Sequence, residues 1–206
     1  MKSNKPLHIV HVVSGDLWGG VEAQVHTLCK YLTRAQSVEV SVVVLNDGEL
    51  KDRLESDGIS TYLLDESKFS AVQLLSALRV LFKNLRVDII HSHGPKQNIL
   101  SSLANIKQRA RSVRTQHSAP EFEFGFSQHL SYWLDRFCGR FLQDMIVAVS
   151  AELGRELGRF YPDSSTWKRK LVNPILNLFT SHVIAISEAT KQALAEFENI
   201  PRRSID

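Results

Sequence analysis

The sequence is poor in the features that define several classes of protein. It has only two cysteines among 206 residues, Cys29 and Cys138, and neither has a partner at metal-ligand spacing. This scarcity argues against a disulfide framework and against a zinc module. The N-terminal apolar run is too short for a signal peptide or a membrane span. We therefore expect two buried thiols in a cytoplasmic protein, with a peripheral contact at the inner face of the membrane left open.

An excess of charge of one sign is also missing. Lys and Arg number 25 and Asp and Glu number 22, which gives a net charge of +3. This balance argues against a nucleic acid as the main partner. Basic groups gather at Arg109, Arg111 and Arg114 and at 168–170. We interpret both groups as solvated faces, with a contact to an anionic membrane or a phosphate as the alternative.

What the chain does have is apolar sequence, 43% of it, arranged in alternating patterns. Short β-branched runs predict strands, and apolar residues at helical spacing predict helices between them. Strands are predicted at 7–13, 38–45, 59–65, 87–94, 111–118 and 145–150. Helices are predicted at 19–33, 69–85, 96–108, 126–142 and 151–160. This alternation predicts an α/β fold with a doubly wound parallel, Rossmann-like sheet.

The end of the chain contains an apparent repeat. The strand, serine and acidic first turn of 145–157 recur at 182–194. We expect residues 1–160 to form the Rossmann-like domain. We expect residues 161–206 to form a crossover helix and the repeated strand-serine-helix unit, packed on the same domain.

Three glycines follow the first predicted strand: Gly15, Gly19 and Gly20. Their spacing fits neither the dinucleotide fingerprint nor a Walker loop. A glycine pair that opens a helix exposes backbone N–H groups, which favour an anion and leave room for a diphosphate or a sugar. A tight strand-to-helix turn explains the same glycines without a ligand.

Three histidines lie at the predicted carboxyl ends of strands, where parallel sheets bind ligands. His91 and His93 alternate along one strand and therefore share a face, and His117 ends the next strand. No third metal ligand stands at useful spacing, so we assign no metal. We expect one histidine of the pair to hydrogen-bond within the sheet edge and the other to face the cleft. A neutral imidazole there can donate to a sugar hydroxyl or stabilise a departing phosphate.

Four segments occur in a familiar order: "GGVEAQVHTLCKYL", "VDIIHSHGPKQNILSSLANI", "RTQHSAPE" and "IVAVSAEL". In this order they resemble the N-terminal half of family 4 of the retaining glycosyltransferases, which have the two-domain GT-B fold. The resemblance implies transfer of a sugar from a nucleotide diphosphate donor to a hydroxyl, with retention and without a cofactor or a required metal. Ser150 matches the serine that caps the last helix of this half, and we include it among the substrate-binding positions.

The resemblance also implies roles for other residues. The backbone of Gly19 and Gly20 would lie against the donor diphosphate or the acceptor. His117 matches the histidine that faces the donor sugar and is the expected catalytic residue. His93 and Gly94 match the turn that helps to form the acceptor site.

One part of the family pattern has no counterpart in these residues. The resemblance implies a second, C-terminal domain that holds most of the donor nucleotide, and nothing in the sequence matches it. We therefore expect the chain alone to bind donor weakly and to be nearly inactive. The acceptor is expected to be a carbohydrate or a lipid-linked sugar.

Other functions are weighed against this one. A non-catalytic module that binds a glycan or a partner protein is the main alternative, and its exposed apolar patch would favour self-association. A nucleotide-sugar epimerase shares the architecture, but Asp16 and Glu121 are the only nearby carboxylates that could act as acid and base. The glycine pattern argues against an enzyme that uses NAD.

Overall fold

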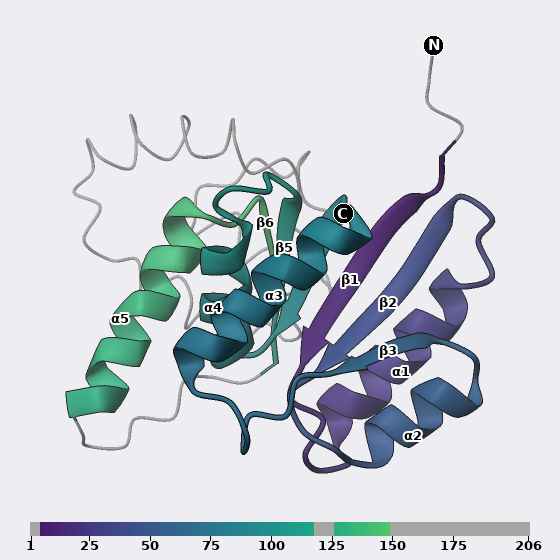
Figure 1. The fold of residues 1–206 in the computed structure, drawn as a ribbon, viewed down its shortest axis with the longest axis horizontal. Coiled ribbons are helices and arrows are strands. Elements are labelled where there is room, and N and C mark those ends of the chain that lie inside the picture. The colour runs from purple at the N-terminus through teal and green to yellow at the C-terminus, as the bar shows by residue number, and fades with distance from the viewer. Residues whose placement is uncertain (1–4, 118–125, 149–206) are drawn as a thin grey trace.

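The computed structural model describes residues 5–117 and 126–148. These residues form a six-stranded sheet, parallel at every pairing, with the strand order β3-β2-β1-β4-β5-β6 (Figure 1). The strands are β1 (Leu7–Val13), β2 (Val38–Val44), β3 (Ser60–Leu63), β4 (Ile89–His93), β5 (Arg111–Gln116) and β6 (Met145–Ala148). The predicted doubly wound parallel sheet is confirmed.

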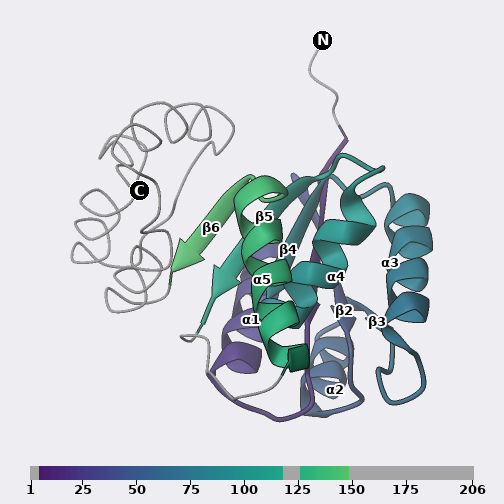
Figure 2. The same cartoon turned by 90° about the vertical axis from the view of Figure 1, so that its left-hand side faces the viewer.

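Helices cover both faces of the sheet (Figure 2). On one face lie α1 (Gly20–Leu32) and α2 (Glu49–Ser56), and on the other lie α3 (Ala71–Leu85), α4 (Pro95–Asn105) and α5 (Phe126–Phe141). Two buried apolar clusters follow this division, since Val10 and Val12 of β1 pack with α3 while Val13 packs with α1. Alternation along each strand therefore decides which helices a side chain meets.

The ends of the helices follow local chemistry. Ser70 and Gln73 form a reciprocal capping box at the start of α3. Pro95 opens α4 directly after Gly94, whose φ of 123° is unfavourable for other residues. The N-cap of α1 is Gly19, which has no side chain, so no side chain caps the first N–H groups of this helix.

Two sequence interpretations need correction. α2 was not predicted, because only Leu50 and Leu54 of this short helix are buried and the rest is polar. Arg114 does not belong to a solvated face: it is 4% exposed and its Nη2 lies 2.7 Å from Asp135 Oδ2 of α5. Alternation along β5 turns Arg114 to the α5 side of the sheet, whereas Arg111 is exposed and pairs with Asp144.

Other expectations concern cysteines and the end of the chain. Cys29 and Cys138 are free and buried, as predicted. Burial raises the pKa of Cys29 to about 12, so it stays a thiol. Most of the first strand-serine-helix unit, including Ser150, lies outside the described residues. The second unit and the rest of the segment 161–206 lie outside them entirely.

Candidate active site

A glycine corner forms where β1 meets α1, at the carboxyl edge of the sheet. Gly15 has a φ of 79°, and its carbonyl lies so close to Gly48 that a side chain on Gly48 would overlap it. Gly19 is the N-cap of α1, and a Cβ on Gly20 would meet no atom within 4 Å. The predicted open backbone at the start of α1 is therefore present. Glu22, in the first turn, lies against Gly19 and complements the helix dipole.

Four imidazoles meet on one face of the sheet, towards the carboxyl edge that also carries the glycine corner. We call His11, His91, His93 and His117 the histidine cluster. Strand register explains it: His11 of β1 lies directly opposite His91 of β4, and His93 lies opposite Thr115, two residues before His117. Because alternate residues of a strand share a face, all four side chains point to the same side.

Hydrogen bonds join three members of the histidine cluster into a chain. His11 Nδ1 lies 3.0 Å from His93 Nε2, and His93 Nδ1 lies 3.1 Å from His117 Nε2. His91 stacks on His93 with ring centroids 4.2 Å apart, and its Nε2 lies 2.7 Å from Thr115 Oγ1. The bonds to both ring nitrogens of His93 hold that ring in place. The nitrogens outside this chain are His117 Nδ1 at one end and the buried His11 Nε2 at the other.

Burial controls the charge of these rings. His11 is 0% and His93 3% exposed, whereas His117 is half-buried. Burial lowers the pKa of His11 to about 4. Burial, followed by repulsion from neighbouring imidazoles, lowers the pKa of His91 and His93 well below 6.5. Burial also lowers the pKa of His117. At neutral pH the cluster is therefore uncharged and each ring carries one N–H.

The structure modifies the sequence expectations for the strand-end histidines. His91 and His93 do share a face, and His91 bonds within the sheet as expected for one of the pair. His93 does not face an open cleft, because His11 and His117 occupy both of its nitrogens. His117, which is half-buried, is more accessible than His93. Sequence reasoning missed His11, since the pairing of β1 with β4 cannot be read from either strand alone.

Gly94 and His8 are both explained by their local structural contacts. Gly94 follows His93 directly, and a Cβ there would lie 2.5 Å from Gln97 Oε1. The turn after β4 therefore needs glycine for its φ of 123°, whereas the flexible Gln97 side chain could move aside for a methyl group. His8, on β1 but on the opposite face, bonds to Leu85 O and Ser41 Oγ and is a structural histidine.

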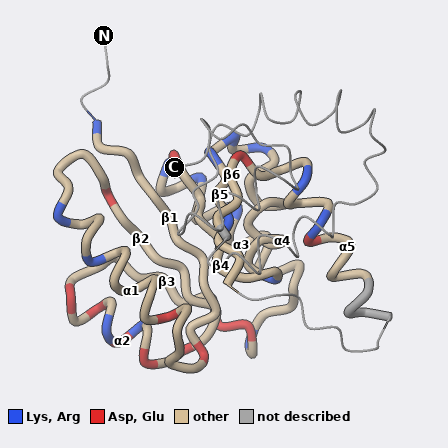
Figure 3. Tube along the Cα trace, turned by 180° about the vertical axis from the view of Figure 1, so that it is seen from behind, with Lys and Arg blue, Asp and Glu red and all other residues tan. Residues whose placement is uncertain are grey.

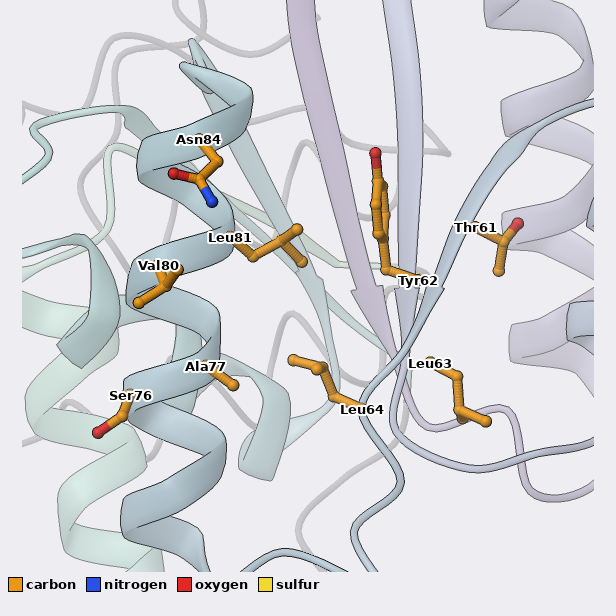
Figure 4. Close-up of a pocket in the computed structure, with 9 residues that line it drawn as sticks. All are labelled: Thr61, Tyr62, Leu63, Leu64, Ser76, Ala77, Val80, Leu81 and Asn84. Atoms are coloured by element: carbon orange, nitrogen blue, oxygen red, sulfur yellow. The ribbon is translucent and has the colours of Figure 1, made fainter.

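An open groove of about 660 Å³ lies between β3 and α3 (Figure 4). Tyr62, Leu64 and Leu81 point into it, and the residues that line it carry no charge. Since it lies beyond β2 from the histidine cluster and offers no catalytic group, we do not include it in the candidate active site.

Comparison with solved structures identifies the fold. HepE of Anabaena, solved with UDP-glucose, superposes with a TM-score of 0.62 over 97% of this chain and 68% of that one, at 11% identity. A UDP-N-acetylglucosamine 2-epimerase superposes with a TM-score of 0.58 over 98% of this chain and 68% of that one, at 14% identity. Identities this low show the fold alone, which is the Rossmann-like half of a GT-B protein.

Sequence comparison separates the transferases from the epimerases. The model of Glycosyltransferase Family 4 matches residues 18–166, and the chain belongs to this family. CapH of Staphylococcus aureus, a capsular polysaccharide biosynthesis glycosyltransferase, is 31% identical over 119 residues, which are 56% of this chain and 33% of CapH. The chain thus spans about a third of the length of this curated relative. The resemblance noted in the sequence is confirmed.

Proposed function

We propose that this chain is the acceptor-side domain of a retaining glycosyltransferase that uses a nucleotide diphosphate sugar. The family match supports the reaction class, and the solved complex of HepE with UDP-glucose supports this class of donor. In the transfer, the acceptor oxygen bonds to the anomeric carbon, the bond from that carbon to the diphosphate breaks, and the acceptor proton leaves with the diphosphate. No residue described here needs to form a covalent intermediate.

The observation that carries the proposal is that β1, β4 and β5 are successive parallel strands, so that His117 and the glycine corner both follow strands at the same carboxyl edge of the sheet. His93 Nδ1 engages His117 Nε2, which directs Nδ1 of His117 away from the histidine cluster. We assign His117 to the donor sugar, as a hydrogen-bond donor to a sugar hydroxyl or to the departing phosphate. Gly94 and His93 shape the adjoining acceptor turn, and His93 acts by positioning His117. Ser150 remains a proposed substrate-binding residue.

The backbone at Gly19 and Gly20 is assigned to the diphosphate or the acceptor. The first N–H groups of α1 have no side-chain cap, and the space beside Gly20 is open. An anion at this end is favoured by the helix dipole. Glu22 opposes a second negative charge, so the site suits one phosphate edge or a sugar hydroxyl better than a fully buried diphosphate.

We further propose that the chain needs a separate donor-binding domain for turnover. Its match covers about a third of CapH, and the described residues form a single Rossmann-like unit. Alone, the chain is expected to bind donor weakly and to transfer little sugar. We place the reaction in the cytoplasm, where nucleotide sugars would be available to it.

A panel of radiolabelled nucleotide sugars, offered with and without a donor-domain chain from a CapH-like enzyme, tests this proposal. We expect transfer only with both chains present, and its loss in His117→Ala. The His26→Gln variant is the matched control, since it removes an imidazole of α1 that pairs with Asp57, outside the histidine cluster. No transfer with any donor domain, together with retained glycan binding, would favour the non-catalytic module.

A second test addresses the glycine corner. Gly20→Ala adds a methyl group where no atom lies within 4 Å, so the fold should keep its stability. We expect weaker donor binding by calorimetry with an unchanged melting temperature. Unchanged binding would remove the α1 N-terminus from the site.

One helix face favours a peripheral membrane contact. The structure shows no helix among its described residues that is long and apolar enough to cross a membrane. On α5, however, five large apolar side chains recur at helical spacing and are 37% to 61% exposed: Leu130, Trp133, Leu134, Phe137 and Phe141. Arg136 and Arg140 share the helix, and the acidic residues concentrate around α2, away from α5 (Figure 3). Aromatic and basic residues together favour the interface of an anionic bilayer.

We propose that this face of α5 rests on the membrane that carries a lipid-linked acceptor. Co-sedimentation with phosphatidylglycerol vesicles should exceed that with phosphatidylcholine vesicles. The double variant Trp133→Ser, Phe137→Ser should lose it, while Val72→Ser, an equally exposed apolar site on α3, should not. Dimers in sedimentation, without vesicle binding, would instead assign the face to a protein partner.

A further inference from the structure

Three members of the histidine cluster form an arrangement that neither the sequence nor the family predicts. The ligand atoms of His11, His91 and His93 all lie within 4.8 Å of one another. Two adjacent strands supply them, and the parallel register of β1 and β4 fixes their relative positions. The third ligand that the sequence lacked is therefore His11, which the fold brings from 80 residues away along the chain to lie beside His91.

The donor set selects the kind of metal. Imidazole nitrogens suit zinc, copper and nickel, whereas magnesium and calcium need oxygen ligands. Three histidines with one position left open are an established set of zinc ligands. With Zn–N bonds of about 2.0–2.1 Å, tetrahedral ligand nitrogens lie about 3.3 Å apart. His11 Nδ1 and His93 Nε2, at 3.0 Å, are near that separation, and the wider spacings require the rings to draw inward.

His11 also contains a buried nitrogen without a partner. His11 is 0% exposed, and its Nε2 has no hydrogen-bond partner in the structure. Buried polar atoms are nearly always paired, so an unpaired imidazole nitrogen needs an explanation. The bond between His11 and His93 occupies only one nitrogen of His11, whichever tautomer it adopts. An ion bound through His11 Nδ1 would replace the bond to His93 and leave Nε2 unchanged, so the spacing of the three rings, and not this nitrogen, is the evidence for a metal.

The surrounding contacts are those of metal-binding histidines, which usually donate their second N–H to a neighbour. His91 Nε2 reaches Thr115 Oγ1, so its Nδ1 remains for a metal. His93 Nδ1 reaches His117 Nε2, so its Nε2 remains. Ligation of His93 through Nε2 would oblige its Nδ1–H to donate to His117, which then carries its own proton on Nδ1.

From this geometry we propose that His11, His91 and His93 bind one divalent ion of the zinc class. The site lies on one face of the sheet, and the ion would link strand β1 to strand β4. The ion acts on the transfer only indirectly, by setting the tautomer of His117, and this effect rests on the proposed function. The ion would enter beside His117, the half-buried member of the histidine cluster.

The test uses the complete 206-residue chain without a histidine tag, stripped with a chelator. Zn²⁺ alone is titrated by calorimetry, the retained metal is measured by mass spectrometry, and Co²⁺ reports the coordination geometry through its visible absorption. We expect one equivalent of Zn²⁺, tetrahedral Co²⁺ bands and a higher melting temperature with the metal. Because no sugar is present, the outcome is independent of glycosyl transfer.

Variants assign the ligands. His11→Gln and His91→Gln should each weaken Zn²⁺ binding at least about tenfold. His117→Gln keeps the three ligands and should retain binding, as should His26→Gln. Circular dichroism checks that each variant is folded. The absence of tetrahedral Co²⁺ bands in the unmodified chain overturns the proposal without any variant, as does full Zn²⁺ affinity in folded His11→Gln.

Discussion

The buried ion pair between β5 and α5 allows a quantitative prediction. Arg114 Nη2 lies 2.7 Å from Asp135 Oδ2, and the two side chains are 5% and 10% exposed. Asn98 Nδ2 donates to the other carboxylate oxygen over 2.7 Å, so Asp135 is satisfied on both sides. Replacing Asp135 with Ala leaves the Arg114 charge buried without its counterion. Breaking such a pair costs about 3–5 kcal/mol in the free energy of unfolding.

The double substitution separates the pair from its surroundings. Arg114→Met combined with Asp135→Leu removes both charges and keeps apolar volume, so it should recover most of the stability lost in Asp135→Ala. Urea unfolding followed by circular dichroism gives each free energy, and an unchanged m-value ensures comparability. As a control, Arg111→Met breaks the exposed pair with Asp144 and should cost less than about 1 kcal/mol. If Asp135→Ala costs no more than Arg111→Met, the reasoning about this buried charge is wrong.

Three further predictions concern the core, the turn after β4 and acid stability. Phe82 is fully buried in the apolar cluster between α3 and the sheet. Phe82→Ala should therefore lower the free energy of unfolding, measured in urea, by about 3–5 kcal/mol. A loss below about 1 kcal/mol would contradict this packing. Gly94→Ala should lower the melting temperature, because a φ of 123° is strained for alanine, whereas Gly20→Ala should not. Burial lowers the pKa of His11 from 6.5 to about 4. Its contribution, about 3 kcal/mol, is therefore present above pH 6.5 and is lost from the metal-free chain as the pH falls towards 4. Between pH 6.5 and about 4, the free energy of unfolding should fall less in His11→Gln than in the unmodified chain. Equal losses in the two chains would exclude His11 as the cause.

The sequence predicted most of the architecture because its periodicities are strong. The β-branched runs of β1 and β2 and the apolar spacing of α3 are each sufficient to identify the element. α2 escaped prediction because two buried leucines four residues apart are a weak signal in a charged segment. Arg114 was misassigned because a cluster of basic residues in sequence says nothing about which strand face each one occupies.

The candidate active site was predictable only in part. His93, Gly94 and His117 follow from their places at strand ends, which parallel topology brings to one edge. His11 does not, because its neighbours depend on which strands pair and in what register. The chemistry of His93 depends on that pairing, since two other imidazoles occupy its nitrogens. Long-range pairing therefore converted an expected cleft residue into a buried one.

The close approach of Gly48 to Gly15 has a consequence for the start of α1. Two backbones in contact move together, and so a change in the segment that follows β2 is transmitted to the entrance of α1. A side chain at Gly48 would therefore displace the Gly15 carbonyl and with it the backbone that leads into α1. The geometry at the start of α1 thus depends on a residue that is almost 30 positions away in the sequence.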